Sequence, residues 1–180
     1  MPHAGLPEIT ESSLRLRRAQ SPAEVEALRP VLVGERITQW WGADPVDDLL
    51  TELETVALID VDGALAGVLQ CHEESYEQYP EVAFDIALGP AWQRAGLGPR
   101  AITLAMRHYA AAGHHRFVID PAADNHAAVA AYERAGFERV GVLRCYERTS
   151  QGGWRDGLMM QALAWELPDV RDAYRPPVAG

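Results

Sequence analysis

Residues 93–98 read Gln-Arg-Ala-Gly-Leu-Gly, and this short stretch is the most informative part of the chain. It follows a strand-like segment, residues 81–88, and precedes a helix-like segment, residues 100–112. The first N–H groups of a helix lack partners within the helix, and the helix dipole adds positive potential, so such a turn suits a pyrophosphate. Gly96 and Gly98 lack the Cβ atoms that would hold a ligand away. A plain turn with the same two glycines is the commoner interpretation, so the prediction needs a second motif.

The rest of the chain predicts alternating strands and helices. Apolar patterning predicts strands over residues 14–17, 56–60, 65–70, 81–88, 116–120, 138–147 and 158–165. Helices are expected over residues 22–32, from Pro45 through Leu53, over 100–112 and over 126–135. Two of them begin with a capping residue followed by proline, at Ser21-Pro22 and Asp44-Pro45. The tryptophan pair at residues 40–41 is expected in the loop between the first two helices.

One carboxylate stands out in this pattern. Asp85 is the only charged residue within the otherwise apolar run 82–88. The strand, helix and strand from residue 81 to residue 120 should form a right-handed crossover, which places the two strands parallel. Asp85, the glycine turn and the turn from Asp120 to Asn125 are therefore expected near one region of the sheet.

Composition excludes some classes of function. Lys and Arg total 16 against 26 Asp and Glu, a net charge of -10, which argues against a nucleic-acid partner and favours cationic ligands. Cys71 and Cys145 have no metal-ligand spacing, and a reducing cytoplasm fits them. No segment reads as a signal peptide or a membrane span. We expect a flexible N-terminus over residues 1–12, a single domain over 13–167 and a C-terminal surface tail over 168–180.

A second motif follows the first and carries a family resemblance. It reads Asp120-Pro121-x-x-x-Asn125-x-x-Ala128-x-x-x-Tyr132-Glu133-x-x-Gly136-Phe137. With residues 93–98 it resembles the GCN5-related N-acetyltransferase (GNAT) superfamily, across residues 81–140. Within that superfamily the chain is similar to the aminoglycoside 6'-N-acetyltransferases, enzymes of antibiotic resistance. The similarity lies in Trp40-Trp41-Gly42, the isolated Asp85, Asp120-Pro121, and the Asp156-Gly157 turn before the last strand.

The resemblance implies both a fold and a reaction. The fold would be α/β (α+β), with a mixed, mostly antiparallel sheet of six to seven strands flanked by about four helices. The sheet would be splayed between the fourth and fifth strands. The reaction would be transfer of an acetyl group from acetyl-CoA to a primary amine by direct attack on the thioester, with no metal.

The resemblance also implies where acetyl-CoA binds. Its pyrophosphate would lie on the N–H groups of the glycine turn, and its pantetheine would pair with the backbone of residues 86–88. Asn125 has two interpretations that are compatible, a helix N-cap and a partner of the cofactor amide. The expected cofactor residues are Ile86, Ala87, Leu88, Gln93, Arg94, Ala95, Gly96, Leu97, Gly98, Pro99, Arg100, Asn125, Ala128 and Tyr132.

The amine chemistry assigns two catalytic residues. An alkyl amine with a reference pKa of ~10.4 arrives protonated at pH 7, so it can bind a carboxylate but cannot attack. Asp85 would hold the ammonium group first and accept its proton second, directly or through a water molecule. Tyr132 would donate a proton to the departing thiolate. The structural alternatives are a strand aspartate bonded to a backbone N–H or an arginine, and a core tyrosine.

The expected substrate is a small cationic amine, and an aminoglycoside fits the acidic composition. The expected substrate-binding residues are Trp41, Glu73, Tyr76, Asp85, Asp120 and Asp156. For each glutamate of the loop from Glu73 to Glu81, a solvated surface is the alternative. Other acceptors remain open, namely a hydroxylysine-type siderophore precursor or a protein or peptide amine, as does a catalytically silent sensor of acetyl-CoA or an amine. No membrane partner is expected, and the chain would be a monomer or a homodimer.

Overall fold

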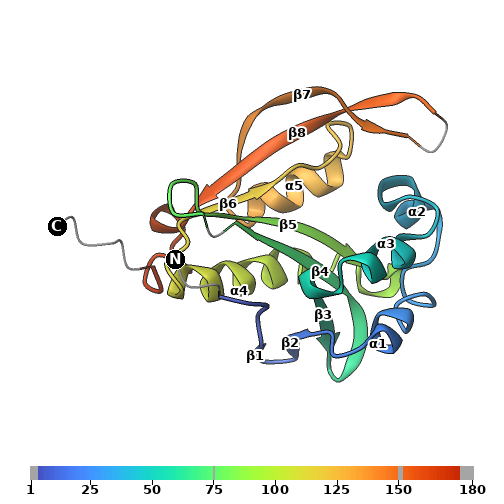
Figure 1. Ribbon diagram of the computed structural model, residues 1–180, viewed down its shortest axis with the longest axis horizontal. Helices are drawn as coiled ribbons and strands as arrows, with labels where there is room; N and C mark the ends of the chain where they lie inside the picture. The colour runs from blue at the N-terminus through green and yellow to red at the C-terminus, as the bar shows by residue number, and fades with distance from the viewer. Residues whose placement is uncertain (1–3, 75, 150–151, 175–180) are drawn as a thin grey trace.

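The computed structural model describes residues 4–74, 76–149 and 152–174, which build one sheet flanked by helices (Figure 1). Eight strands are present in these residues, in the spatial order β1-β2-β3-β4-β5-β6-β8-β7. The strands are β1 (Ile9–Glu11), β2 (Leu14–Arg18), β3 (Val56–Val61), β4 (Ala64–Glu74), β5 (Glu81–Leu88), β6 (Arg116–Ile119), β7 (Glu138–Arg148) and β8 (Trp154–Leu163). Every neighbouring pair is antiparallel except β5 and β6, which are parallel.

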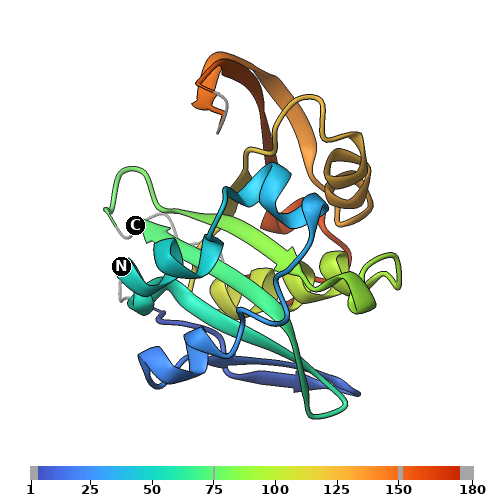
Figure 2. The ribbon, with the colours of Figure 1, turned by 90° about the vertical axis from the view of Figure 1, so that its right-hand side faces the viewer.

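Helices cover both faces of the sheet. Those of the described residues are α1 (Pro22–Glu26), α2 (Glu35–Trp41), α3 (Pro45–Thr51), α4 (Leu97–Ala111) and α5 (His126–Arg134). Apolar residues of α4 and α5 belong to one buried cluster, and those of α1, α2 and α3 belong to a second cluster. Figure 2 shows α2 and α3 in front of the sheet and α4 behind it. The predicted class, a mixed and mostly antiparallel α/β fold, is confirmed.

The region before β3 differs from the prediction. The first helix was expected to reach residue 32 but ends at Glu26, and Pro30 disfavours a helical backbone at the residue before it. The chain then forms α2, so the tryptophan pair lies in a helix and not in a loop. Gly34 and Gly42 flank α2 with φ values of 103° and 81°, which glycine adopts without steric cost.

Parts of both terminal segments belong to the described fold. The segment predicted to be flexible contains β1, whose Ile9 pairs with Leu16 of β2. In the predicted tail, Val170 is completely buried, beside Leu167 of the core. Residues 1–3 and 175–180 of these two expected segments lie outside the described residues.

The parallel strands separate soon after they begin. Val82 pairs with Phe117 and Ala83 with Val118, and these are the pairs of β5 with β6 in the part of the chain that the structure describes. From Asp85 onward, β5 continues to pair with β4, where Asp85 lies opposite Gln70. The predicted splay between the fourth and fifth expected strands is therefore confirmed, and it opens one edge of β5.

Candidate active site

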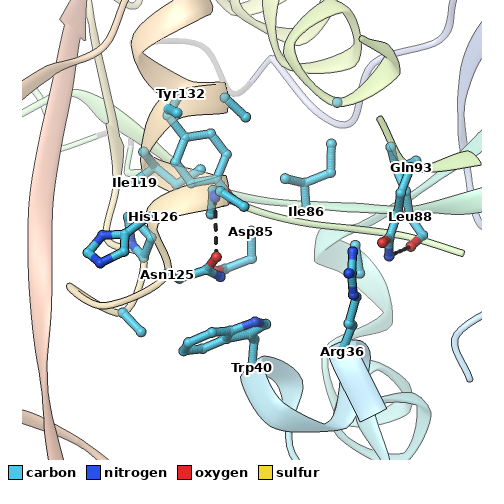
Figure 3. Close-up of a pocket in the computed structure, with 18 of the residues that line it drawn as sticks. Arg36, Trp40, Asp85, Ile86, Leu88, Gln93, Ile119, Asn125, His126 and Tyr132 are labelled. Carbon is cyan, nitrogen blue, oxygen red and sulfur yellow. Dashed lines mark hydrogen bonds between the residues drawn. The ribbon is translucent and has the colours of Figure 1, made fainter. Parts of the chain in front are cut away.

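A cavity of about 1030 Å³ lies where β5 and β6 separate. Figure 3 shows its lining side chains coming from β5, the glycine turn, α2 and α5. Further lining residues, Tyr146 and Glu147, belong to β7. The cavity thus joins both predicted motifs with elements from either end of the sequence.

One end of the cavity is built by the glycine turn. Gly96 has φ 74° and ψ 6°, the left-handed conformation, and directly precedes the first residue of α4. The Nε2 group of Gln93 donates to the carbonyl oxygen of Leu88 at 2.8 Å, which fastens the turn to the end of β5. A Cβ atom at Gly98 would meet only Leu88 Cδ1, at 3.8 Å. The space beside the helix N-terminus is therefore open to a ligand, and the backbone N–H groups there suit a pyrophosphate.

Most of the predicted cofactor residues line this cavity. The lining includes Ile86, Ala87, Leu88, Gln93, Arg94, Gly96, Leu97, Gly98, Pro99, Asn125, Ala128 and Tyr132. Ala95 and Arg100 do not line it, and both are exposed. The glycine turn and the first turn of α4 direct these two residues away from the gap, which sequence spacing alone did not reveal.

Asp85 points into the middle of the cavity (Figure 3). Its side chain is 52% exposed, with Oδ2 at 3.9 Å from His72 Nε2 on β4. The surrounding walls remove much of the water that would solvate the charge, and the carboxylate of Asp120 adds repulsion. Together they raise the pKa of Asp85 to about 6.

Helix α5 presents Asn125 and Tyr132 to the same space (Figure 3). Asn125 Oδ1 accepts from the backbone N–H of Ala128 at 3.2 Å, so the predicted N-cap is present and the side-chain NH₂ group is left for another acceptor. Tyr132 is 9% exposed and packs in the core, with its ring 6.3 Å from that of Phe137. Burial, followed by the charges of Asp85 and Asp120, raises the pKa of Tyr132, so the phenol stays protonated. The core interpretation of Tyr132 is therefore confirmed, and because the residue also lines the cavity, its catalytic role stays a prediction.

Asp120 and Tyr146 also line the cavity. A hydrogen bond to Asp120 is the main cause that raises the pKa of Tyr146 to about 12. A Cβ atom at Gly157 would lie 2.7 Å from Tyr146 Cδ1, so only glycine lets this ring pack there. Gly157 therefore leaves the space that the Tyr146 ring occupies beside the cavity, although Gly157 itself does not line it.

Three predicted substrate residues lie outside the cavity. Asp156 Oδ1 accepts from the backbone N–H of Cys145 at 2.8 Å, where Cys145 has φ 50° in an irregular part of β7. Glu73 is a buried carboxylate, which accepts from the N–H of Ala4 at 2.7 Å and binds His114 Nε2 at 2.8 Å. Tyr76 is 60% exposed, and its ring stacks 6.2 Å from that of Tyr79. Trp41 and Asp120 do line the cavity, together with Asp85.

Several lining residues were not predicted from the sequence: Arg36, Trp40, Tyr146 and Glu147. Arg36 and Trp40 are four residues apart on α2, and residues at this spacing share one helix face. Predicting α2 would therefore have drawn attention to the pair. No local sequence pattern marks Tyr146 and Glu147 as cavity residues, because they belong to β7, which is far from β5 and α2 in the sequence.

Two absences hold for the described residues. They contain no group of three or more His, Cys, Asp or Glu side chains that could hold a metal ion. None of their helices has the length and apolar character needed to cross a membrane.

Comparison with known proteins identifies the family. The model of the acetyltransferase (GNAT) family matches residues 15–137. The chain belongs to the GNAT family of acetyltransferases. Acetyl-CoA is the co-substrate of this family, and the glycine turn of this GNAT protein fits its pyrophosphate. No protein with a curated description matches the sequence.

Solved structures show the same fold at low sequence identity. One is an acetyltransferase from Salmonella typhimurium that modifies the N-terminal serine of ribosomal protein L7/L12, with TM-score 0.74, 22% identity and coverage of 85% of this chain and 96% of that chain. A second is spermidine N-acetyltransferase from Vibrio cholerae in complex with CoA and spermine, with TM-score 0.69, 21% identity and coverage of 84% and 95%. A third is the microcin C7 self-immunity acetyltransferase MccE in complex with acetyl-CoA and AMP, with TM-score 0.70, 20% identity and coverage of 85% and 93%.

Proposed function

We propose that this GNAT protein transfers the acetyl group of acetyl-CoA to a primary amine, and that the amine is the 6'-amino group of an aminoglycoside. The observation that carries the proposal is the position of Asp85, whose carboxylate faces the opening between β5 and β6 with Tyr132 on the adjoining wall. Acetyl-CoA supplies an activated thioester carbonyl. The residues of this chain then orient the amine and move its protons.

Asp85 and Tyr132 have complementary roles in this proposal. The amine arrives as an ammonium ion, and Asp85 binds it and takes up its proton, directly or through water. With a pKa of about 6, Asp85 is a stronger base than an ordinary carboxylate and is still ionised at pH 7. As the new C–N bond forms and the C–S bond breaks, Tyr132 donates a proton to the thiolate. The second proton lost by the amine nitrogen then restores the phenol through water. The backbone of residues 86–88 is the proposed partner of the carbonyl oxygen.

An aminoglycoside is supported by the chemistry of the cavity beyond Asp85. Asp120 and Asp124 add carboxylates for further ammonium groups, and Trp40 and Trp41 offer flat apolar surfaces for a sugar ring. Glu73 and Asp156 do not contribute, so this end is less acidic than the sequence suggested. The lining carboxylates therefore suit a substrate that presents one or two ammonium groups to the cavity better than one that presents many.

A second acceptor class is favoured by one observation. Arg36 lines the same cavity as Asp85, and its guanidinium group suits a carboxylate. An amine that also carries a carboxylate, such as a hydroxylysine-type precursor or a peptide, would use both charges. The free cysteines Cys71 and Cys145 fit the cytoplasmic location that we propose for either reaction.

The test is the release of CoA thiol from acetyl-CoA across a panel of amines. The panel includes an aminoglycoside with a 6'-amino group, the matched compound with a 6'-hydroxyl group, spermidine, N⁶-hydroxylysine and a peptide with N-terminal serine. Turnover confined to the 6'-amino compound supports the first proposal. Turnover confined to hydroxylysine or the peptide supports the second, and tight binding of acetyl-CoA with no turnover would identify a silent sensor.

A further inference from the structure

Arg155 joins three elements of the structure through a single guanidinium group. It lies on β8, and its Nε and one terminal nitrogen donate to the two carboxylate oxygens of Glu147 at 2.7 and 2.5 Å. The other terminal nitrogen donates to the carbonyl oxygen of Gln39 in α2 at 2.9 Å. The carbon of the same group lies 5.0 Å from the centre of the Trp40 ring. A planar cation with forked donors makes these contacts at once, which an ammonium group does not.

The groups that Arg155 contacts line the cavity, whereas Arg155 itself does not. Gln39, Trp40 and Glu147 are lining residues. The Arg155 side chain is 16% exposed and lies behind them. Arg155 therefore supports the cavity wall from outside, and any effect that it has on a bound molecule passes through its partners.

The contacts of Arg155 link helix α2 with the β7–β8 hairpin, two parts of the fold that are far apart in the sequence. Helix α2 packs with the cluster under α1 and α3, while β7 and β8 form the far edge of the sheet. Figure 1 shows the β7–β8 hairpin extending beyond the body of the sheet, on the side where α2 lies. Arg155 is the point at which the hairpin holds the helix, so it ties together the two walls at this end of the cavity.

Helix α2 depends on such contacts for its position. It has seven residues, begins at Gly34 without a side-chain cap, and buries only Ile37 among its own residues. A helix of this length is not stable by propensity alone, so tertiary contacts place it. A cation near its C-terminal end also interacts favourably with the helix dipole. Arg155 supplies both the hydrogen bond and the charge.

We propose that Arg155 is a positioning residue, which fixes Trp40 and the end of α2 against the β7–β8 hairpin and so determines how tightly the amine substrate binds. The proposal rests on the proposed function only in placing the amine at this end of the cavity. It assigns Arg155 no role in binding acetyl-CoA, because none of the groups that Arg155 contacts belongs to the glycine turn. Pairing with Arg155 also neutralises Glu147, which leaves Asp85, Asp120 and Asp124 as the carboxylates facing the amine.

The kinetic test compares Arg155→Ala and Arg155→Lys with Arg148→Ala. Arg148 is an exposed arginine on the same hairpin, and its side chain makes no hydrogen bond or ion pair with the residues that the structure describes. We expect Arg155→Ala to raise the KM of the amine about tenfold, with kcat and the KM of acetyl-CoA changed less than about threefold. Arg155→Lys should raise the KM of the amine nearly as much as Arg155→Ala does. Arg148→Ala should leave this KM equal to that of the parent protein. An unchanged or lower KM of the amine in Arg155→Ala would overturn the proposal, as would an equal effect of Arg148→Ala.

A double substitution asks whether the effect passes through Trp40. Once Trp40→Ala is in place, adding Arg155→Ala should raise the KM of the amine less than about twofold further, because the positioned ring is already absent. Full additivity of the two substitutions would show that Arg155 acts by another route.

Hydrogen exchange tests the same contact without substrate or turnover. The backbone amides of residues 35–41 should exchange at least about tenfold faster in Arg155→Ala and Arg155→Lys, with α4 unchanged as an internal control. Faster exchange in α2 with no turnover of any amine would leave the positioning role standing while refuting the proposed reaction. Unchanged exchange in α2 would overturn the positioning role even if an amine is turned over.

Discussion

Asp85 meets two conditions that suit a base at neutral pH. Its carboxylate opens into the cavity, and the surrounding walls and Asp120 raise its pKa to about 6. The structural alternative was a strand aspartate bonded to a backbone N–H or an arginine, and its side chain makes no such bond within the described residues. The basic side chain within 4 Å of its carboxylate there is His72, whose Nε2 lies 3.9 Å from Oδ2. The geometry therefore favours a functional role over a structural one.

Replacing Asp85 by asparagine should separate chemistry from cofactor binding. We expect Asp85→Asn to lower kcat by about a hundredfold or more, because the group that accepts the proton is lost, and to leave the Kd of acetyl-CoA unchanged. In the parent protein, kcat/KM should fall as the pH drops through about 6, where the carboxylate becomes protonated. Steady-state rates between pH 5 and 8 and titration calorimetry measure both effects. Equal losses in kcat and in acetyl-CoA affinity would contradict the assigned role.

The same substitution should affect stability with a defined sign. The folded pKa of Asp85 is above its ordinary value of 3.8, so the folded state binds the proton more tightly and loses stability as the pH rises from about 4 to about 6. Asp85→Asn removes this cost above pH 6. With the side chain half exposed, the gain in the free energy of unfolding at pH 8 should be about 1 kcal/mol or less. Urea unfolding at pH 8 should show it, and a clear loss of stability would contradict the raised pKa.

Removing the hydroxyl of Tyr132 tests the proposed acid. Tyr132→Phe keeps the ring that packs beside Phe137, so the fold and the KM of acetyl-CoA should be preserved. We expect kcat to fall roughly tenfold to a hundredfold, since a thiol is a fair leaving group and needs only partial assistance. Stopped-time assays with saturating amine give the value. An undiminished kcat would return Tyr132 to a purely structural role.

Among the elements, helix α4 has an N-terminus with open space beside it, which is the proposed binding surface for the pyrophosphate. Gly98 lies in the first turn of α4, and a Cβ atom there would make only an ordinary contact with Leu88. The protein without ligand therefore accepts alanine at this position. A phosphate group lying on the helix N-terminus would not, because it occupies the same space.

Gly98→Ala should accordingly weaken acetyl-CoA without weakening the fold. We expect the Kd of acetyl-CoA to rise about tenfold, while the free energy of unfolding stays equal or rises by up to about 1 kcal/mol through helix propensity. Gly141→Ala is a matched control, since Gly141 also has open space around it but lies on β7. Calorimetric titration and thermal melts decide the result. A drop in stability with unchanged Kd would remove Gly98 from the cofactor site.

At the scale of the whole molecule, the acidic residues serve two separate purposes. Asp85 and Asp120 gather in the cavity, whereas Glu73 secures the N-terminal segment through the N–H of Ala4 and the imidazole of His114. Both side chains of the Glu73–His114 pair are almost completely buried. Replacing one member of such a buried pair is destabilising, because the other polar group stays buried and loses its partner.

Glu73→Gln should therefore damage stability and spare catalysis. We expect the free energy of unfolding to fall by about 3 kcal/mol, with the KM of the amine and the Kd of acetyl-CoA within twofold of the parent. Urea denaturation and steady-state kinetics give the two readings. A stable Glu73→Gln protein with a raised amine KM would restore the role in substrate binding that the sequence suggested.

Local pattern was enough to predict the parts of this protein whose structure is decided by neighbouring residues. Short motifs predict the glycine turn and the cap at Asn125. The handedness of the crossover predicts the parallel arrangement that places Asp85 near both of them. Helix α2 was missed because glycines, rather than polar caps, flank it and because a distant arginine holds it. Its Arg36 and Trp40 were missed with it.

Short motifs, and the family that they resemble, were enough to predict the fold class, the acetyl-CoA motif and the catalytic candidates. Which acidic and aromatic residues line the cavity became evident only from how the chain folds. Glu73, Asp120 and Asp156 are alike as isolated carboxylates, yet one is buried with His114, one lines the cavity and one accepts from the backbone of Cys145. The difference arises from packing between segments far apart in sequence, which no local pattern encodes.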